Sequence, residues 1–183
     1  MRTFNRKRSK IPEEVEVPIE KLIAELPEDM RQAGRATVKS FGVKSRFVHF
    51  EFFRLLEDHE GLGKKGDIMA LEVNMRPSGG NSPDMMNYAN DIDVYQIWAD
   101  MVCFDKGRFD PEHRPYCCVY ASRRRNRQYA NSHEDIYAAY GANIVMYEEM
   151  PEVLSGAMGN FAYIARFPTE AEAMAFAEFA LKK

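Results

Sequence analysis

The sequence has little cysteine, no long apolar run and no excess of positive charge. Its only cysteines are Cys103, Cys117 and Cys118, an odd number without the paired spacing of a zinc site, so we expect reduced thiols in the core. No apolar stretch could cross a bilayer, and no apolar segment follows the basic residues 1–10 as in a signal peptide. We therefore expect a cytoplasmic protein without a membrane partner. The net charge of −3 gives no basic field for nucleic acid.

The chain does have enough apolar material for a core. Hydrophobic residues make up 45% of its 183 residues, and a chain of this length buries roughly 70% of its unfolded surface. Residues 46–55 and 67–75 predict the two strands of a hairpin, because both are rich in strand-forming residues and turn residues separate them. In the register that we predict, Leu56 pairs with Asp67 at the loop end.

The second strand of this hairpin carries polar residues. Alternate side chains of a strand share a face, and one face of this strand carries Ala70, Glu72, Asn74 and Arg76. In the predicted register Glu51 faces Glu72, and two carboxylates about 5 Å apart repel by roughly 3 kcal/mol at an effective dielectric near 20. We therefore expect a cation between them. Carboxylate and amide oxygens favour a hard divalent ion such as Mg²⁺.

Two other interpretations of this face stay open. His49 lies two residues before Glu51 on the same face, and a His/Glu/Glu cluster would suit a transition metal better than Mg²⁺. In that case Asn74 and segment 76–80 would have no role. The hairpin could also be an ordinary sheet edge with solvated charges.

Three stretches of the chain carry a resemblance to a known family. They are FVHFEFF (47–53), ALEVNMRPSGG (70–80) and PDMMNYANDIDVYQIWADMV (83–102). Over about residues 28–108 the chain resembles the C-terminal catalytic half of the ATP-grasp superfamily, which includes biotin carboxylase-like and carbamoyl phosphate synthetase-like ligases. The resemblance implies an α+β fold, with a partial ATP-grasp domain over 1–108, its antiparallel sheet covered by helices, and a small α/β subdomain over 109–183 packed on it.

The resemblance also implies roles for individual residues. Glu51, Glu72 and Asn74 would bind two Mg²⁺ ions that bridge the phosphates of ATP, with Glu72 contacting both ions. Arg76 would stabilise the transferring phosphoryl group or an acyl phosphate. The loop that borders the acyl phosphate or the acceptor substrate would consist of Ser78, Gly79 and Gly80.

The resemblance implies that the complete enzyme would be an ADP-forming ligase that joins a small-molecule carboxylate to an amine. It is about twice as long, with an N-terminal lid portion that binds ATP, and segment 12–18 only faintly resembles the hinge of that portion. We expect this chain to be the C-terminal part, inactive alone. Phe47, Phe53 and Leu55 would then form an exposed apolar seam that a second copy could cover. A non-catalytic interaction module on the same scaffold is the other alternative.

Helices on either side of the hairpin are expected to complete the core. One runs from Glu28 to Phe41 and stops at Gly42. A second carries an apolar stripe at helical spacing that reads as core, formed by Tyr95, Trp98, Met101 and Val102. We expect the hairpin to bury Val48, Phe50, Phe52, Leu71 and Val73.

Residues 109–183 carry no recognisable chemistry. Strands and helices alternate in this segment, and Thr169 with Glu172 has the pattern of a capping box. The basic run Arg123–Arg127 reads as a solvated loop, with phosphate binding as the alternative. His133 is expected to face solvent.

Overall fold

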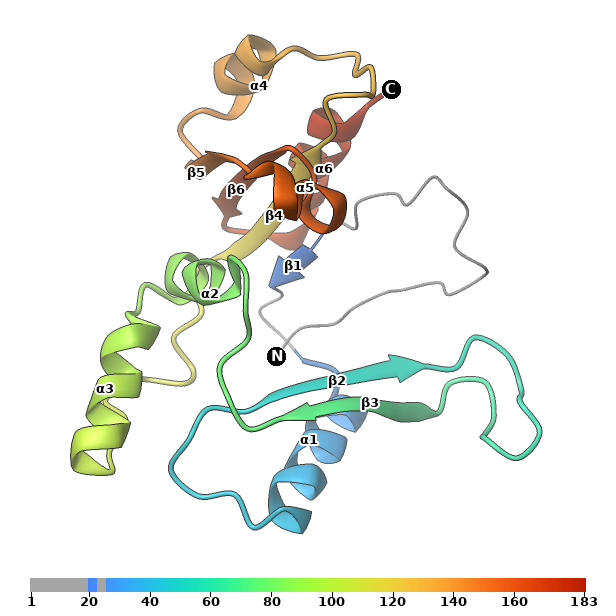
Figure 1. The fold of residues 1–183 in the computed structure, drawn as a ribbon, viewed down its shortest axis with the longest axis vertical. Coiled ribbons are helices and arrows are strands. Elements are labelled where there is room, and N and C mark those ends of the chain that lie inside the picture. The colour runs from blue at the N-terminus through green and yellow to red at the C-terminus, as the bar shows by residue number, and fades with distance from the viewer. Residues whose placement is uncertain (1–19, 23–25) are drawn as a thin grey trace.

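The computed structural model describes residues 20–22 and 26–183 of the 183-residue chain. Within them lie six helices and six strands in two antiparallel sheets, so the predicted α+β fold is confirmed (Figure 1). The hinge-like segment 12–18 lies outside the described residues. None of the described helices is long and apolar enough to cross a membrane. The elements in order are β1 (Glu20–Leu22), α1 (Glu28–Ser40), β2 (His49–Arg54), β3 (Ile68–Asn74), α2 (Ser82–Asn90), α3 (Val94–Phe104), β4 (Cys117–Arg123), α4 (His133–Tyr140), β5 (Ile144–Glu149), α5 (Glu152–Met158), β6 (Phe161–Phe167) and α6 (Glu170–Leu181).

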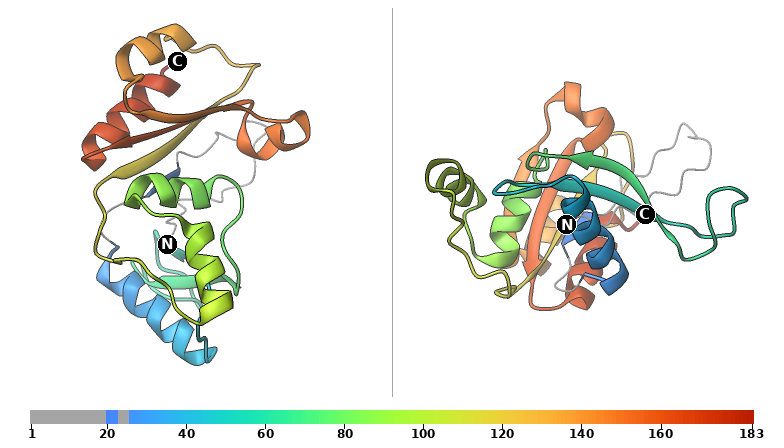
Figure 2. Two further views of the ribbon diagram at one scale, coloured as in Figure 1. Left: turned by 90° about the vertical axis from the view of Figure 1, so that its left-hand side faces the viewer. Right: turned by 90° about the horizontal axis from the view of Figure 1, so that it is seen from below.

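A four-stranded sheet in the order β1-β4-β6-β5 holds the main core. All seven residues of β4 are buried because helices lie on both faces of the sheet (Figure 2). Since successive side chains alternate between faces, Val119 packs with Phe176 of α6, whereas Cys118 packs with Met85 of α2. A strand that is covered on both faces has a continuous apolar sequence, as CCVYAS does. The division of the chain at residues 108 and 109 stays a prediction.

The hairpin β2–β3 forms the second sheet and lies against α1 (Figure 1). Glu51 pairs with Glu72, so the central pair of the predicted register is confirmed. The next pair is Phe52 with Ala70, which leaves Leu71 as the extra residue of a β-bulge.

The bulge changes which hairpin side chains are buried. Phe50 and Phe52 are buried as predicted, but Leu71 is 59% exposed, so its predicted burial is wrong. On the Phe52 side of the hairpin, Arg54 forms an ion pair with Asp29 of α1 at 2.7 Å. The hydrogen bond from Arg54 holds the pKa of the Asp29 carboxyl below its usual value.

The predicted apolar seam is also partly wrong. Leu55 is only 5% exposed, because the hairpin loop folds back and places Gly63 beside it. Phe47 and Phe53 are half-buried. The bulge moves the register by one residue, so that Leu55 rather than the predicted Leu56 meets Asp67, with its amide 2.9 Å from the Asp67 carbonyl.

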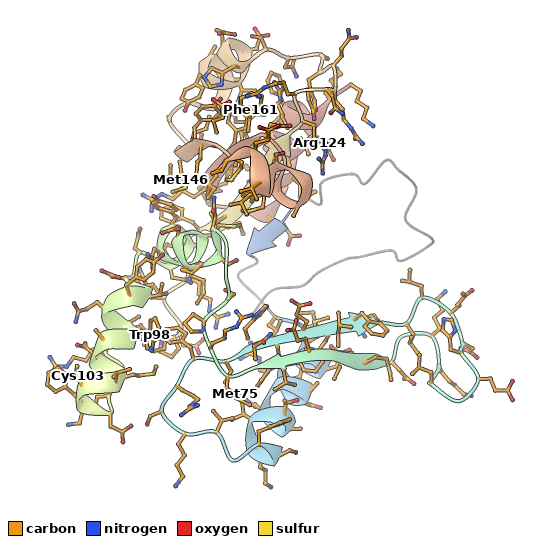
Figure 3. The ribbon with its side chains drawn as sticks, in the orientation of Figure 1. Met75, Trp98, Cys103, Arg124, Met146 and Phe161 are labelled. Atoms are coloured by element: carbon orange, nitrogen blue, oxygen red, sulfur yellow. The ribbon has the colours of Figure 1, made fainter. Side chains whose placement is uncertain are left out.

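Helix α3 projects from the rest of the molecule, with Trp98 and Cys103 on it (Figure 3). It buries Val94 and Ile97, and the predicted core stripe is wrong because three of its members are mostly or half exposed, namely Tyr95, Trp98 and Val102. The prediction of a core thiol is wrong for Cys103, which is exposed, and confirmed for the free thiols Cys117 and Cys118. Burial raises the pKa of Cys118 to about 12.

Side-chain caps begin three of the helices. The capping box of Thr169 and Glu172 at α6 is confirmed. A second capping box, formed by Ser132 and Asp135, begins α4. At α3 the Asp93 carboxylate accepts hydrogen bonds from two amides of the first turn. Each of these caps pairs amides that have no partner within the helix.

Gly42 ends α1 as predicted. Its φ of +59° is a left-handed conformation, and the amides of Gly42 and Val43 donate to the carbonyls of Lys39 and Val38 at 3.1 Å, which is the Schellman pattern.

Replacing Gly42 by Ala should destabilise the protein by about 1 kcal/mol, because an alanine is strained at positive φ. A Cβ there would meet no other atom within 4 Å, so the loss is conformational. Urea unfolding measures it. Gly79→Ala, at another glycine with open space and no positive φ, is the matched control and should change stability by less than about 0.5 kcal/mol. Equal stabilities of the two variants would contradict the view that the positive φ of Gly42 requires glycine.

The prediction of a solvated loop holds for only part of the basic run, because the Arg125 side chain is 65% exposed whereas other members make structural contacts. Arg123 is buried and its Nε donates to the carbonyl of Ala180 in the last turn of α6 at 2.7 Å. Arg124 donates to two carbonyls of α5, and Arg125 forms an ion pair with Glu149 of β5. These arginines therefore connect β4 to three other elements.

His133 does not face solvent as predicted. Its Nδ1 shares a hydrogen bond of 2.8 Å with the hydroxyl of Tyr163, and its ring packs against Tyr137 and Tyr147. Burial raises the pKa of Tyr163 to about 12.

Candidate functional site

The polar face of the hairpin is assembled by the pairing of β2 with β3. Glu51 lies opposite Glu72, and His49 lies opposite Asn74, so all four residues share one face. Directly opposed side chains of antiparallel strands lie about 5 Å apart. The structure thus places Glu51, Glu72 and Asn74, the predicted metal ligands, on one face of the hairpin.

The β-bulge removes one predicted member from this face. Ala70 pairs with Phe52, the neighbour of Glu51, and therefore points to the opposite face from Glu72. The prediction that Ala70 shares the polar face is wrong because an extra residue, Leu71, interrupts the alternation. Bulges of this kind re-aim side chains and are frequent beside active sites.

Burial varies across the polar face. The side chains of His49 and Glu51 are 10% and 21% exposed, and His49 Nε2 lies 3.6 Å from Glu51 Oε1. Asn74 Nδ2 is buried and has no hydrogen-bond partner among the described residues. Glu72 is exposed. A ligand arriving from solvent would therefore meet Glu72 first and the more buried groups behind it.

No lysine or arginine of the described ranges forms an ion pair with Glu51 or Glu72. Opposed like charges destabilise a strand pair, so a cation between them would be stabilising. Two carboxylates and the amide oxygen of Asn74 fit a hard divalent ion whose other ligands are phosphate or water oxygens. Residues 20–22 and 26–183 contain no group of three or more His, Cys, Asp or Glu side chains that could hold a metal ion.

Arg76 and the glycine loop follow β3 rather than belong to it. Arg76 lies two residues beyond the end of β3, so the alternation of strand side chains does not place it on the polar face of the hairpin. Its Nη1 donates to the carbonyl of Pro77 at 2.9 Å. In the loop, Ser82 Oγ donates to the carbonyl of Gly79 at 3.0 Å, and Gly80 has a φ of +61°. The loop therefore turns directly into the start of α2.

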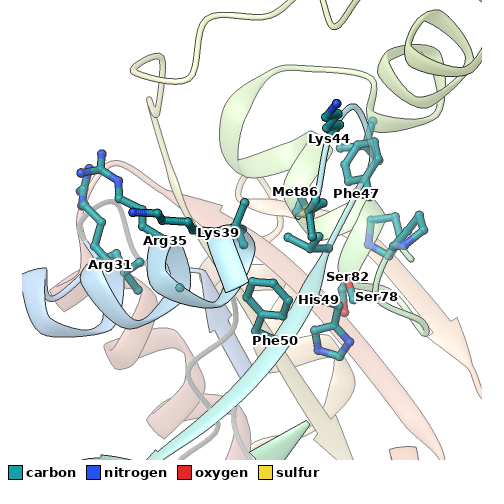
Figure 4. A pocket seen from close by; sticks show the side chains of 18 of the residues that line it. Arg31, Arg35, Lys39, Lys44, Phe47, His49, Phe50, Ser78, Ser82 and Met86 are labelled. Carbon is teal, nitrogen blue, oxygen red and sulfur yellow. The ribbon is translucent and has the colours of Figure 1, made fainter. Parts of the chain in front are cut away.

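A cavity of about 670 Å³ lies between α1, the start of β2 and α2 (Figure 4). Ser78 of the predicted substrate loop lines it, and so does His49, which contacts Glu51; the cavity therefore adjoins the polar face. Most of its described wall is apolar, for example Val38 and Met86. No Asp or Glu occurs among its described lining residues.

The sequence reasoning missed four cations that line this cavity. Arg31, Arg35 and Lys39 are spaced four residues apart in α1 and so form one stripe, and Lys44 follows in the next loop. Like charges at this spacing destabilise a helix. The spacing was therefore a usable signal for an anionic partner, because it sets three cations along one side of a helix.

Comparison with known proteins adds no relative from which a role could be transferred. No protein-family model matches this chain, and no curated protein matches it.

Proposed function

We propose that this chain supplies the magnesium- and phosphate-binding end of an ATP-grasp ligase. The observation that carries the proposal is the direct pairing of Glu51 with Glu72, with Asn74 on the same face. Mg²⁺ at phosphoryl-transfer sites is held by one or two carboxylates together with substrate phosphates. The resemblance of the sequence to the ATP-grasp superfamily leads to the same three residues.

Each residue of the face has its own part in this proposal. Glu51 and Glu72 would hold two Mg²⁺ ions, with the exposed Glu72 reaching both and Asn74 offering its amide oxygen to one. When bound, Mg²⁺ supplies positive charge that neutralises the phosphate oxygens of ATP. His49, 3.6 Å from Glu51 Oε1, would orient that carboxylate. Arg76 would stabilise the transferring phosphoryl group.

The proposed reaction joins a small-molecule carboxylate to an amine. A carboxylate oxygen attacks the γ-phosphorus of ATP and the bond to ADP breaks, which gives an acyl phosphate. The amine nitrogen then attacks the acyl carbon, phosphate leaves, and the nitrogen loses its proton. The loop Ser78, Gly79 and Gly80 would border the acyl phosphate. We also propose a cytoplasmic location, which the free thiols Cys117 and Cys118 support because that compartment keeps thiols reduced.

Mg²⁺ and ATP together should raise the melting temperature of the chain only at high ATP concentration, because we expect weak binding where the ATP-binding lid portion of this family is not recognisable in the sequence. A ligand at 100 times its dissociation constant stabilises by about 2.7 kcal/mol, a shift of roughly 5–10 °C for a protein of this size. Differential scanning fluorimetry measures the shift, with Mg²⁺ alone and ATP with EDTA as controls. No shift with Mg·ATP would contradict the proposal. Any turnover should release ADP, and release of AMP would exclude the reaction class.

Zinc binding is a second candidate function; the 3.6 Å contact of His49 with Glu51 favours it, whereas the absence of any group of three His, Cys, Asp or Glu ligands among the described residues counts against it. Zn²⁺ alone should then raise the melting temperature, and this shift should vanish in His49→Ala but persist in Asn74→Ala. A shift with Mg·ATP and none with Zn²⁺ would exclude it.

A further inference from the structure

We infer that the cavity between α1, β2 and α2 is a binding site for a small organic acid, with one anionic group on an apolar body such as an alkyl chain or an aromatic ring. The inference does not depend on nucleotide binding at the hairpin. The volume of about 670 Å³ is within the range of small-molecule sites. Its described lining combines cationic side chains with an apolar wall and contains no acidic side chain.

Three of the four cations at the cavity form no ion pair with a described acidic residue. Arg31 Nε lies 3.5 Å from Glu28, but no ion pair is formed by Arg35, Lys39 or Lys44 within the described ranges. Arg31, Arg35 and Lys39 all extend from α1 on one side of the cavity (Figure 4). Because like charges four residues apart destabilise a helix, an anion held between Arg35 and Lys39 would relieve this repulsion.

The rest of the cavity fits an apolar body. Val38 of α1, Phe47 just before β2, Phe50 of β2 and Met86 of α2 contribute to its wall. Polar groups are few, and Ser82 Oγ already donates to a loop carbonyl. A polar body such as a sugar would lose its hydrogen bonds to water against this wall, whereas an alkyl or aryl group loses none. The concave shape suits a discrete molecule rather than a bilayer surface.

Isothermal titration of decanoate and of decanol into the full chain, without Mg²⁺ or nucleotide, tests the inference. The two probes share an alkyl chain and differ in charge, so decanoate should bind at least about tenfold more tightly. The double variant Arg35→Gln/Lys39→Gln should lose this preference and leave decanol binding within twofold. Met86→Gln should weaken both probes. Lys64→Gln/Lys65→Gln removes two charges from the exposed hairpin loop and should change neither.

Several outcomes would overturn the inference. Decanoate binding that is unchanged in Arg35→Gln/Lys39→Gln, or no tighter than decanol binding, removes the anion site. Loss of decanoate binding in Trp98→Gln would place the ligand on the exposed face of α3 instead. Binding to vesicles of phosphatidylcholine and phosphatidylglycerol in the absence of decanoate binding would indicate a membrane surface. Circular dichroism of each variant checks that it is folded.

Discussion

Glu72→Gln should weaken Mg²⁺-dependent nucleotide binding by at least about 100-fold, and Glu51→Gln should weaken it less. Changes to groups that only support a metal ligand already cost 10–100-fold in metal affinity, so a direct ligand should cost at least as much. The difference arises because a carboxylate that contacts two ions serves both, whereas Glu51 serves one. Isothermal titration of ATP at fixed Mg²⁺ measures both losses. Equal losses would contradict the bridging role of Glu72.

The same two variants give a second readout without metal. Glu51 and Glu72 are direct cross-strand partners, so removal of either charge should stabilise the metal-free protein by roughly 0.2–1 kcal/mol. Glu60→Gln, in the exposed hairpin loop, is the matched control and should leave both binding and stability unchanged. Weaker binding together with greater metal-free stability is the combination that a functional carboxylate pair predicts. A variant that merely unfolds would lose both.

The hairpin shows which features of a strand pair the alternation of polar and apolar residues predicts and which it does not. Period-two patterning and the opposed glutamates predicted the Glu51–Glu72 pair correctly. The prediction failed at Leu71, because a β-bulge adds one residue to one strand and cannot be recognised from the alternation of polar and apolar residues. Local pairing was therefore predictable, whereas the faces of residues beyond the bulge were not.

Helix α3 illustrates a second limit of prediction from the sequence pattern. Its apolar residues recur at helical spacing, which predicted a helix correctly, but spacing does not say which face finds a partner. The structure joins α3 to α2 through the hydrogen bonds of the Val94 amide with Asn87 and of the Tyr95 hydroxyl with Asp84. Val94 and Ile97 are buried, whereas Trp98 and Val102 stay exposed.

Contacts between distant residues explain the remaining errors. The Arg123 side chain donates a hydrogen bond to the carbonyl of Ala180, 57 residues away, and His133 shares a hydrogen bond with Tyr163, 30 residues away. Each looked like a solvated residue because its local sequence is polar. The cavity likewise exists only where α1, β2 and α2 meet, so no single stretch of sequence could have revealed it.

Gly159→Ala should destabilise the protein by about 3 kcal/mol, a loss of roughly 6–12 °C in melting temperature. Gly159 has φ +80° and ψ 178°, a conformation that is essentially restricted to glycine, and an added Cβ would overlap Ser122 Oγ of β4. The chain cannot easily move away, because the Tyr120 hydroxyl donates to the carbonyl of Met158 at 2.8 Å and the amide of Asn160 donates to a β4 carbonyl at 2.8 Å. Chemical denaturation measures the loss.

Two further variants separate the causes of this loss. Gly156→Ala, three residues earlier in α5, adds a Cβ that meets nothing within 4 Å and should be neutral or slightly stabilising. Ser122→Ala removes a buried hydroxyl that has no partner among the described residues, so it should be tolerated. The double variant Ser122→Ala/Gly159→Ala should regain only part of the loss, because the positive φ remains. Full recovery would show that steric overlap alone fixes glycine at this position, and a Gly159→Ala protein as stable as Gly156→Ala would contradict both causes.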